Sequence, residues 1–168
     1  PLGNGFELTK NGSTLLIGGG IGTAPLYQLA KELEEKNNDV TLLLGLTDHQ
    51  DIVLSEIMEA FKPERILIED VIGERQGLVT TLVEELEPSS YDQIYACGPT
   101  PMFKAIKKIL GEKAKDAQFS TEEKMGCGVG LCFSCTCKVE DKEKKEWSNK
   151  RVCVEGPVFK GDEVIFDD

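Results

Sequence analysis

The sequence predicts an α/β fold in which a doubly wound parallel sheet is followed by a smaller second domain. Short apolar runs of strand length alternate with amphipathic stretches over the first part of the chain. Strands that alternate with helices form βαβ units with right-handed crossovers, and these build a parallel sheet. After about residue 122 the sequence becomes rich in glycine and cysteine, so loops and short strands are expected there, with the charged residues 141–146 forming an exposed hairpin tip.

The predicted strands are residues 14–17, 40–44, 65–68 and 93–96, with 117–120 as a possible fifth. Their nearly continuous apolar character is typical of strands that are buried on both faces of a sheet. The predicted helices are residues 24–36, 51–60, 77–86 and 101–110. In the first of these helices Leu26, Leu29 and Leu33 recur at helical spacing, which places them on one face.

Composition and charge restrict the class of protein. Of the 168 residues, 40% are hydrophobic and 29% are charged, an ordinary balance for a globular chain. The net charge of −11 argues against a nucleic-acid partner, because binding to a phosphate backbone needs a concentrated basic face. No apolar run approaches the roughly 18 residues of a membrane helix, and the N-terminus lacks a signal pattern. We therefore expect a cytoplasmic protein without membrane contact.

A glycine-rich turn, within LLIGGGIGTAPLYQLAKEL, connects the first predicted strand and helix. Glycines let the backbone approach a phosphate closely, and a helix N-terminus offers unpaired N–H groups to an anion. The residues predicted to hold a pyrophosphate here are Gly19, Gly20, Gly22, Thr23 and Ala24. The turn does not complete the G-x-G-x-x-G/A fingerprint, and no Walker lysine follows, so nucleotide binding without triphosphate hydrolysis is expected. A tight turn without a ligand is the alternative.

The residues after the second predicted strand bear on the choice of nucleotide. Thr47 and Asp48 stand where sheets of this kind meet the adenosine ribose. An acidic side chain can hydrogen-bond a ribose hydroxyl but repels a 2′-phosphate. These two residues therefore favour NAD over NADP, with an exposed loop aspartate as the alternative interpretation.

The fourth predicted strand ends in the turn Cys97-Gly98-Pro99, at a carboxyl end where parallel sheets bind ligands. A thiol at this position can pack against a nicotinamide ring, although a small buried residue before a turn would look the same. Together, GGG-x-G-x-A-P after the first strand and CGP-x-x-M after the fourth resemble the pyridine-nucleotide domain of ferredoxin–NADP reductase relatives. The resemblance implies that Cys97, Gly98 and Pro99 lie at the nicotinamide end, with Met102 as a core residue.

Four of the six cysteines lie within eleven residues, in KMGCGVGLCFSCTCKVE. Cys127, Cys132 and Cys135 have C-x4-C-x2-C spacing, and Cys153 follows after seventeen further residues. This is the spacing of plant-type [2Fe–2S] ligands, in which a loop supplies three thiolates and a distant segment supplies the fourth. We expect Cys137 to begin a strand and to point away from such a cluster.

Other interpretations of the cysteines stay open at this point. A structural zinc ion also takes four thiolates, although zinc sites more often use two C-x2-C pairs and this chain has one. Disulfides suit small secreted scaffolds. A Rieske centre needs two histidines, and His49 is the only histidine in the sequence.

The segments EEKMGCGVGLCFSCTCKVE and NKRVCVEGPVFKGDEV, with EDVIGERQGLVT before them, resemble the electron-transfer subunits of NAD-linked dihydroorotate dehydrogenases. The resemblance covers nearly the whole chain, with Val71 where glycine is usual. It implies an NAD-binding domain at 13–121, a [2Fe–2S] domain at 122–168, and a remnant at 1–12 of the linker that follows a missing FAD domain. It also implies an FMN-containing catalytic subunit as partner, in a heterotetramer.

The resemblance implies electron transfer in pyrimidine biosynthesis. Hydride from NADH carries two electrons, whereas a [2Fe–2S] centre takes one, so a flavin must separate the pair. No general acid or base is required from this chain, and on its own it is expected to be inactive. Two alternatives remain: a reductase subunit of similar build that serves a hydrogenase or a ferredoxin–NADP transhydrogenase, and a nucleotide-binding module with structural zinc that is not an enzyme.

Overall fold

The computed structural model describes residues 2–46, 66–70, 77–141 and 146–166 of the chain. The strands of the larger sheet are β1 (Ser13–Gly19), β2 (Asp39–Leu46), β3 (Ile66–Asp70), β4 (Gln93–Cys97), β5 (Ala117–Ser120) and β8 (Val158–Lys160). Those of the smaller sheet are β6 (Thr136–Asp141), β7 (Glu146–Arg151) and β9 (Val164–Ile165). The α-helices are α1 (Thr23–Glu35), α3 (Val79–Glu85) and α4 (Thr100–Leu110). Short 3-10 turns are η1 (Gly20–Gly22), η3 (Pro88–Ser90) and η4 (Gly111–Asp116).

The larger sheet has the strand order β3-β2-β1-β4-β5-β8, and its first five strands are parallel. The predicted doubly wound parallel sheet and its five strands are thus confirmed. The helix predicted over 51–60 lies outside the described residues. Because the chain winds outward in both directions from β1, the order reverses between β1 and β4, and a crevice for a ligand is expected at their carboxyl ends. The sequence did not predict β8, which pairs antiparallel with β5 and closes that edge of the sheet.

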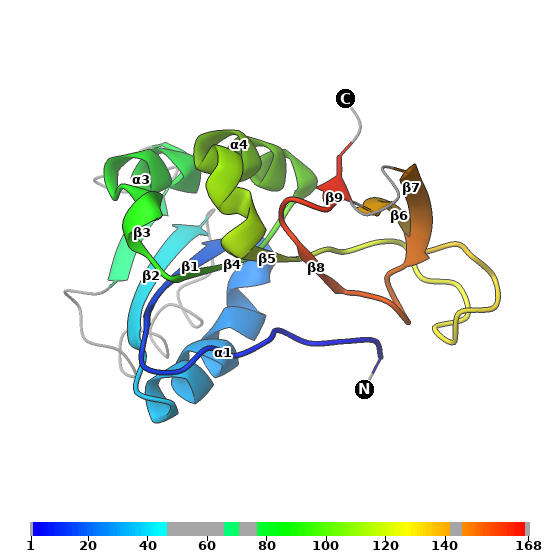
Figure 1. Cartoon of the computed structure of the whole chain (residues 1–168), viewed down its shortest axis with the longest axis horizontal. Helices are drawn as coiled ribbons and strands as arrows, with labels where there is room; N and C mark the ends of the chain where they lie inside the picture. Colours follow the sequence, from blue (N-terminus) through cyan, green and yellow to red (C-terminus); the bar gives the residue numbers. More distant parts are fainter. Residues whose placement is uncertain (1, 47–65, 71–76, 142–145, 167–168) are drawn as a thin grey trace.

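Helices cover both faces of this sheet: α1 lies on one face, and α3 and α4 lie on the other (Figure 1). Side chains of β1 alternate between the two cores. Leu16 packs on the α1 side, and Leu15 and Ile17 pack on the side of α3 and α4. All three are fully buried, which explains why the strand reads as a continuous apolar run.

The core beneath α4 continues into the second part of the chain. The ring of Phe103 stacks on Phe119, with 5.1 Å between centroids, and on Phe166, with 5.6 Å. Lys107 of α4 donates a hydrogen bond to the carbonyl oxygen of Val164 at 2.6 Å. The smaller sheet is therefore held against the larger one by shared packing. No helix in the described part of the chain is long and apolar enough to span a membrane.

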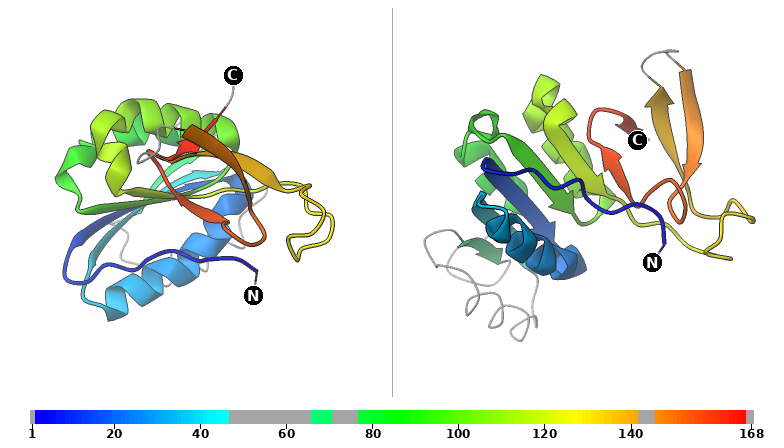
Figure 2. Two further views of the ribbon diagram at one scale, coloured as in Figure 1. Left: turned by 45° about the vertical axis from the view of Figure 1, so that its right-hand side comes forward. Right: turned by 60° about the horizontal axis from the view of Figure 1, so that its bottom comes forward.

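The smaller sheet contains an antiparallel β6–β7 hairpin, in which Asp141 pairs with Glu146. This pairing confirms a hairpin at the charged stretch, whose tip at 142–145 lies outside the described residues. The N-terminal segment runs past both parts of the molecule on its way to β1 (Figure 2). The backbone N–H of Asn4 donates to the carbonyl oxygen of Gly156, and the hydroxyl of Tyr95 donates to the carbonyl oxygen of Glu7 at 3.0 Å.

Candidate functional site

The glycine turn between β1 and α1 requires glycine at two positions for different reasons. Gly20 has a φ of 57°, and a Cβ there would meet open space, so the demand is conformational. At Gly22 the demand is steric, because a Cβ would lie 2.3 Å from the carbonyl oxygen of Cys97. The turn is therefore packed directly against the peptide that joins Cys97 to Gly98.

The first residues of α1 have distinct environments. Thr23 is buried, and both its N–H and its hydroxyl donate to the carbonyl oxygen of Gly20, the hydroxyl at 3.0 Å. Its donors therefore stabilise the turn rather than face a ligand. Ala24 is exposed at the helix N-terminus, where it leaves room for an anion.

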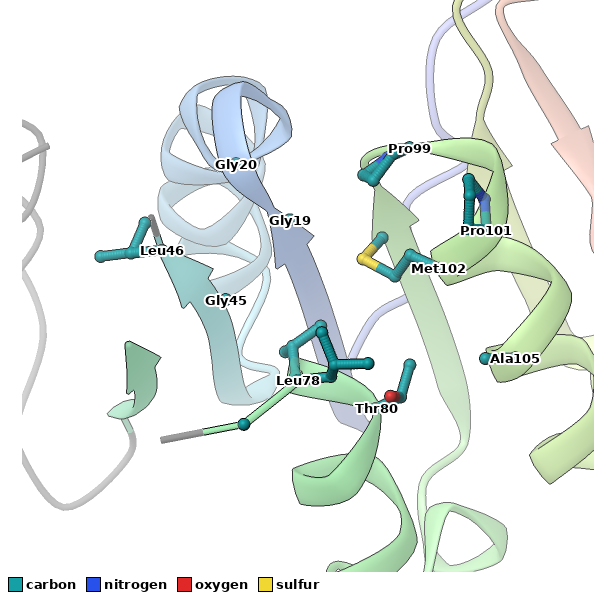
Figure 3. A pocket seen from close by; sticks show the side chains of 12 residues that line it. Gly19, Gly20, Gly45, Leu46, Leu78, Thr80, Pro99, Pro101, Met102 and Ala105 are labelled. Atoms are coloured by element: carbon teal, nitrogen blue, oxygen red, sulfur yellow. The ribbon is translucent and has the colours of Figure 1, made fainter. Parts of the chain in front are cut away.

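A cavity of about 310 Å³ opens at the carboxyl ends of β1, β2 and β4. Three of the predicted residues line it: Gly19, Gly20 and Pro99 (Figure 3). Met102 packs against Gly19, since a Cβ on Gly19 would lie 2.6 Å from the Met102 sulfur. The walls are mostly apolar, with the hydroxyl of Thr80 among the polar groups. A flat ring fits such a slot better than a phosphate does.

The sequence had not identified the part of this cavity that the start of α3 contributes. Leu78 and Thr80 line the cavity opposite α4, and Leu78 is largely exposed to solvent. Met102, predicted as a core residue, is buried but also lines the cavity. The sequence could have indicated this contribution. The segments that follow the strands of a parallel sheet all begin at the same edge, and α3 is the helix that follows β3.

Cys97 lies at the same edge of the sheet but does not line this cavity. Its side chain packs on the α1 side, because it follows Tyr95 by two positions along β4. Burial raises the pKa of the Cys97 thiol, which hydrogen-bonds with Ser120. Gly98 and Pro99 also border a second hollow, of about 390 Å³, beside Glu122. The predicted ribose contacts Thr47 and Asp48 lie outside the described residues.

The cysteine-rich segment forms a loop, residues 122–135, that extends beyond both sheets (Figures 1 and 2). Gly128 and Gly130 have φ values of 69° and 79°, which favour glycine. At Gly126 a Cβ would lie 3.0 Å from the sulfur of Cys132. The glycines therefore let the chain turn closely around its own thiols. We call residues 122–135 the thiol loop.

Backbone N–H groups of the thiol loop point at the sulfur of Cys127. Leu131, Cys132 and Val129 donate to it at 3.3, 3.4 and 3.5 Å. The N–H of Cys127 in turn donates to the sulfur of Cys132 at 3.4 Å. These hydrogen bonds, first that from Val129, lower the pKa of Cys127 to about 6. An exposed thiolate of this kind is suited to bind metal.

Cys135 and Cys153 form a second, buried pair. Both are almost inaccessible, and their thiols hydrogen-bond with each other. Burial, and then this hydrogen bond, raises the pKa of Cys153. The backbone holds the pair together, because the N–H of Val152 donates to the carbonyl oxygen of Cys135 at 2.7 Å.

The four predicted ligands are thus arranged as two pairs of thiols. Among the described residues, no three cysteine, histidine or carboxylate groups converge on one point suited to a single metal ion. A zinc ion would need its four thiolates around one centre, whereas a [2Fe–2S] cluster needs two thiolates at each of two irons. The donor set therefore fits the two-iron cluster.

Cys137 differs from the four predicted ligands. It lies on β6, next to the strand's first residue, and packs half-buried against the main core. Burial, more than nearby charge, raises its pKa to about 11. This environment fits a structural residue. All six cysteines are free thiols.

Comparison with known proteins agrees with both parts of this description. Residues 16–108 match the family described as the oxidoreductase NAD-binding domain. Residues 122–165 match the family described as the iron–sulfur cluster binding domain of dihydroorotate dehydrogenase B. These matches confirm the predicted NAD and iron–sulfur cofactors and the resemblance drawn from the motifs.

The chain is 42% identical to the dihydroorotate dehydrogenase B (NAD(+)) electron transfer subunit of Geobacillus sp. strain WCH70, over 98% of this chain and 63% of the relative. A solved NADH-dependent reduced ferredoxin–NADP oxidoreductase is 33% identical with a TM-score of 0.79, over 98% of this chain and 58% of that chain. The C-terminal domain of a Pyrococcus furiosus hydrogenase is 25% identical with a TM-score of 0.56, over 71% of this chain and 98% of that domain. The chain thus spans just under two thirds of the curated relative's length.

Proposed function

Because the chain belongs to the oxidoreductase NAD-binding family, we propose that it carries electrons between NAD(H) and a catalytic subunit that oxidises dihydroorotate to orotate. One observation carries the proposal: four thiols, arranged as two pairs, lie in the same chain as a nucleotide-binding sheet. The curated relative at 42% identity has this function in its name. The process served would be pyrimidine biosynthesis in the cytoplasm.

The sheet edge would hold the nucleotide. The backbone of Gly19, Gly20 and Gly22 and the start of α1 at Ala24 would bind the pyrophosphate, while Thr23 would close the turn. The apolar cavity beside Met102 would take one of the ring systems. The turn at Cys97, Gly98 and Pro99 would border the nicotinamide, and Thr47 and Asp48 would meet the ribose and favour NAD.

The thiol loop and the turn after β7 would hold the cluster. Its ligands would be Cys127, Cys132, Cys135 and Cys153. When bound, a [2Fe–2S] cluster carries one electron at a time. The N–H groups aimed at Cys127 stabilise negative charge on that sulfur. The buried pair keeps water away from one side, while Cys127 and Cys132 leave the other side accessible.

The accessible side fits a protein partner. Val129, Leu131 and Phe133 in the thiol loop are 63%, 80% and 60% exposed although they are apolar. Apolar side chains grouped on a surface mark sites of protein contact. We propose that this face meets the FMN-containing catalytic subunit, in a heterotetramer, so that water is excluded where electrons pass.

A flavin is needed between NADH and the cluster, because the nucleotide gives two electrons together and the cluster takes one. The resemblance assigns this role to FAD bound outside residues 13–168. We therefore expect the chain alone to bind NAD(H) weakly and to show no NADH oxidation. No side chain described here has to act as a general acid or base.

The test is anaerobic reduction of the isolated chain, followed by its visible absorbance. Dihydroorotate together with an FMN-containing dihydroorotate dehydrogenase catalytic subunit should bleach the absorbance of the cluster. NADH alone should not. Bleaching by NADH alone would contradict the need for a flavin, and no bleaching by the complete mixture would contradict the proposed partner.

A second candidate is a reductase subunit of a ferredoxin–NADP oxidoreductase or a hydrogenase. It is favoured by the TM-score of 0.79 to the first of these enzymes at 33% identity. The same assay separates the candidates, because reduced ferredoxin or a hydrogenase subunit would then bleach the cluster where the dihydroorotate system does not. A nucleotide-binding module with structural zinc would respond to none of these donors.

A further inference from the structure

Arg151, the last residue of β7, contacts the thiol loop at two points. Its Nη1 donates to the carbonyl oxygen of Gly130 at 2.9 Å. Its guanidinium carbon lies 5.0 Å from the centre of the Phe133 ring, which is cation–π geometry. Because Cys132 lies between Gly130 and Phe133 in the sequence, one side chain holds the loop on both sides of a proposed ligand.

Glu155 fixes the guanidinium in place. Its Oε2 accepts from Nε of Arg151 at 3.1 Å and from the Arg151 backbone N–H at 2.7 Å, and its Oε1 accepts from Nη2 at 2.5 Å. This two-oxygen pairing restricts both side chains. The hydrogen bond with Arg151 lowers the pKa of Glu155 to about 2, so the carboxylate is charged at neutral pH. The pair encloses the short turn that carries Cys153.

Gly130 connects this pair to the buried thiols. Its carbonyl oxygen accepts from Arg151, and its N–H faces the sulfur of Cys153 and acts to lower the pKa of that thiol. A Cβ on Gly130 would lie 2.6 Å from the side chain of Val154, so the peptide has little freedom to move. Fixing the Gly130 carbonyl therefore also helps to aim an N–H at a sulfur ligand.

The charge of Arg151 acts on the same sulfurs. Its guanidinium lies 2.9 Å from the carbonyl oxygen of Gly130, two positions before Cys132, and Arg151 itself stands two positions before Cys153. A permanent positive charge beside thiolate ligands stabilises the more negative, reduced form of a cluster. Lysine would not replace the side chain fully, because it lacks the planar fork that bonds Gly130 and Glu155 at once.

We propose that Arg151 is a positioning residue for the iron–sulfur site, which holds residues 130–133 in place and raises the reduction potential of the cluster. The inference rests on the proposed [2Fe–2S] site and goes beyond it, because the cysteine spacing assigns no role to this arginine. Glu155 supports the role by orienting the guanidinium.

The experiment compares three variants of the full chain with the unmodified chain. Arg151→Gln removes the charge and the fork, Arg151→Lys keeps the charge alone, and Lys150→Gln makes the same charge change one position earlier on β7. The measurements are iron and sulfide per chain, the half-life of the visible absorbance with a chelator, and the midpoint potential from a redox titration followed by electron paramagnetic resonance.

Arg151→Gln should lose its cluster about 10-fold faster, as is typical when a partner of a metal ligand is removed, and its potential should fall. Arg151→Lys should also lose its cluster faster but keep a potential nearer that of the unmodified chain. Lys150→Gln should change neither property. If Arg151→Gln retains too little cluster for a redox titration, the inference is tested by the half-life of the visible absorbance of Arg151→Lys.

The inference is overturned if Arg151→Gln matches the unmodified chain in half-life and potential. It is also overturned if Lys150→Gln shifts the potential as much as Arg151→Gln does, or if Arg151→Lys matches the unmodified chain in half-life. Failure of the proposed function would look different, because the unmodified chain itself would then contain no iron and sulfide.

Discussion

The nucleotide-binding turn rests on a closed core, whereas the thiol loop lies outside the core with most of its side chains exposed. Gly22 is buried against β4, and Leu16 and Leu26 pack beneath the turn without exposure. In the thiol loop Val129 and Leu131 face solvent. The first site is therefore shaped by the fold itself. The second is held by hydrogen bonds to sulfur, by one arginine and by the metal that it binds.

This difference shows that the two sites should respond differently to loss of a ligand. A turn whose glycines are fixed by packing keeps its shape when the nucleotide leaves. A loop whose ligands are thiolates gains further stability as the metal binds, because metal binding and local folding are coupled. Perturbations of one site should leave the other intact.

The largest expected effect is that of Cys153→Ser. Removing a buried ligand should abolish the visible absorbance and the iron content, while NAD binding stays unchanged. The matched control is Cys137→Ser, which removes a half-buried thiol on β6 and should keep the cluster. Iron analysis and NAD titration measure the two sites separately. A cluster that survives Cys153→Ser but is lost in Cys137→Ser would reverse the ligand assignment.

Removal of the metal should have the next largest effect, confined to one region. After anaerobic chelation, amide hydrogen exchange should accelerate at least about 10-fold in residues 122–135, because their ordering depends on the metal. Exchange in β1 and β4 should stay slow. Equal acceleration in both regions would show that the two parts unfold as one unit.

Gly22→Ala tests the nucleotide-binding turn. The added Cβ would meet backbone atoms of Cys97 at 2.3 Å, and backbone cannot yield as a flexible side chain can. We expect a loss of about 3 kcal/mol in the free energy of unfolding, with weaker NAD binding. Urea denaturation measures the first and titration the second. Gly5→Ala, where nothing lies within 4 Å, is the control and should be neutral; a neutral Gly22→Ala would refute the close packing.

Thr23→Val should have the smallest effect. It removes the hydrogen bond from the Thr23 hydroxyl to the carbonyl oxygen of Gly20 at 3.0 Å and keeps the shape of the side chain. A loss of about 1 kcal/mol in the free energy of unfolding is expected, again by urea denaturation. A much larger loss of NAD affinity than of stability would show that the hydroxyl contacts the ligand instead.

Much of the nucleotide-binding part could be predicted from the sequence. Strand β1 is buried on both faces, so Leu15, Leu16 and Ile17 leave a continuous apolar signal, and the glycine turn is local in sequence. The edge strand β8 could not be predicted, because three residues, Val158–Lys160, carry too little pattern. The limits of β4 must be known before one can predict which side of the sheet Cys97 faces.

For the cluster site, the sequence predicts the ligands but not what surrounds them. The spacing of Cys127, Cys132 and Cys135 is local, and its chemical meaning does not depend on the fold. The link from Arg151 to Gly130 joins residues 21 positions apart, and no periodicity reports such a contact. Likewise, only the packing shows that Cys135 and Cys153 are buried as a pair.

The most direct test of the account is the iron, acid-labile sulfide and zinc content of the anaerobically purified chain, with its visible spectrum. Two pairs of thiols predict two irons and two sulfides per chain, because each iron of a [2Fe–2S] cluster takes two thiolates. One zinc ion per chain without sulfide would contradict the account, since it would leave a nucleotide-binding protein with a structural metal and no means of carrying electrons.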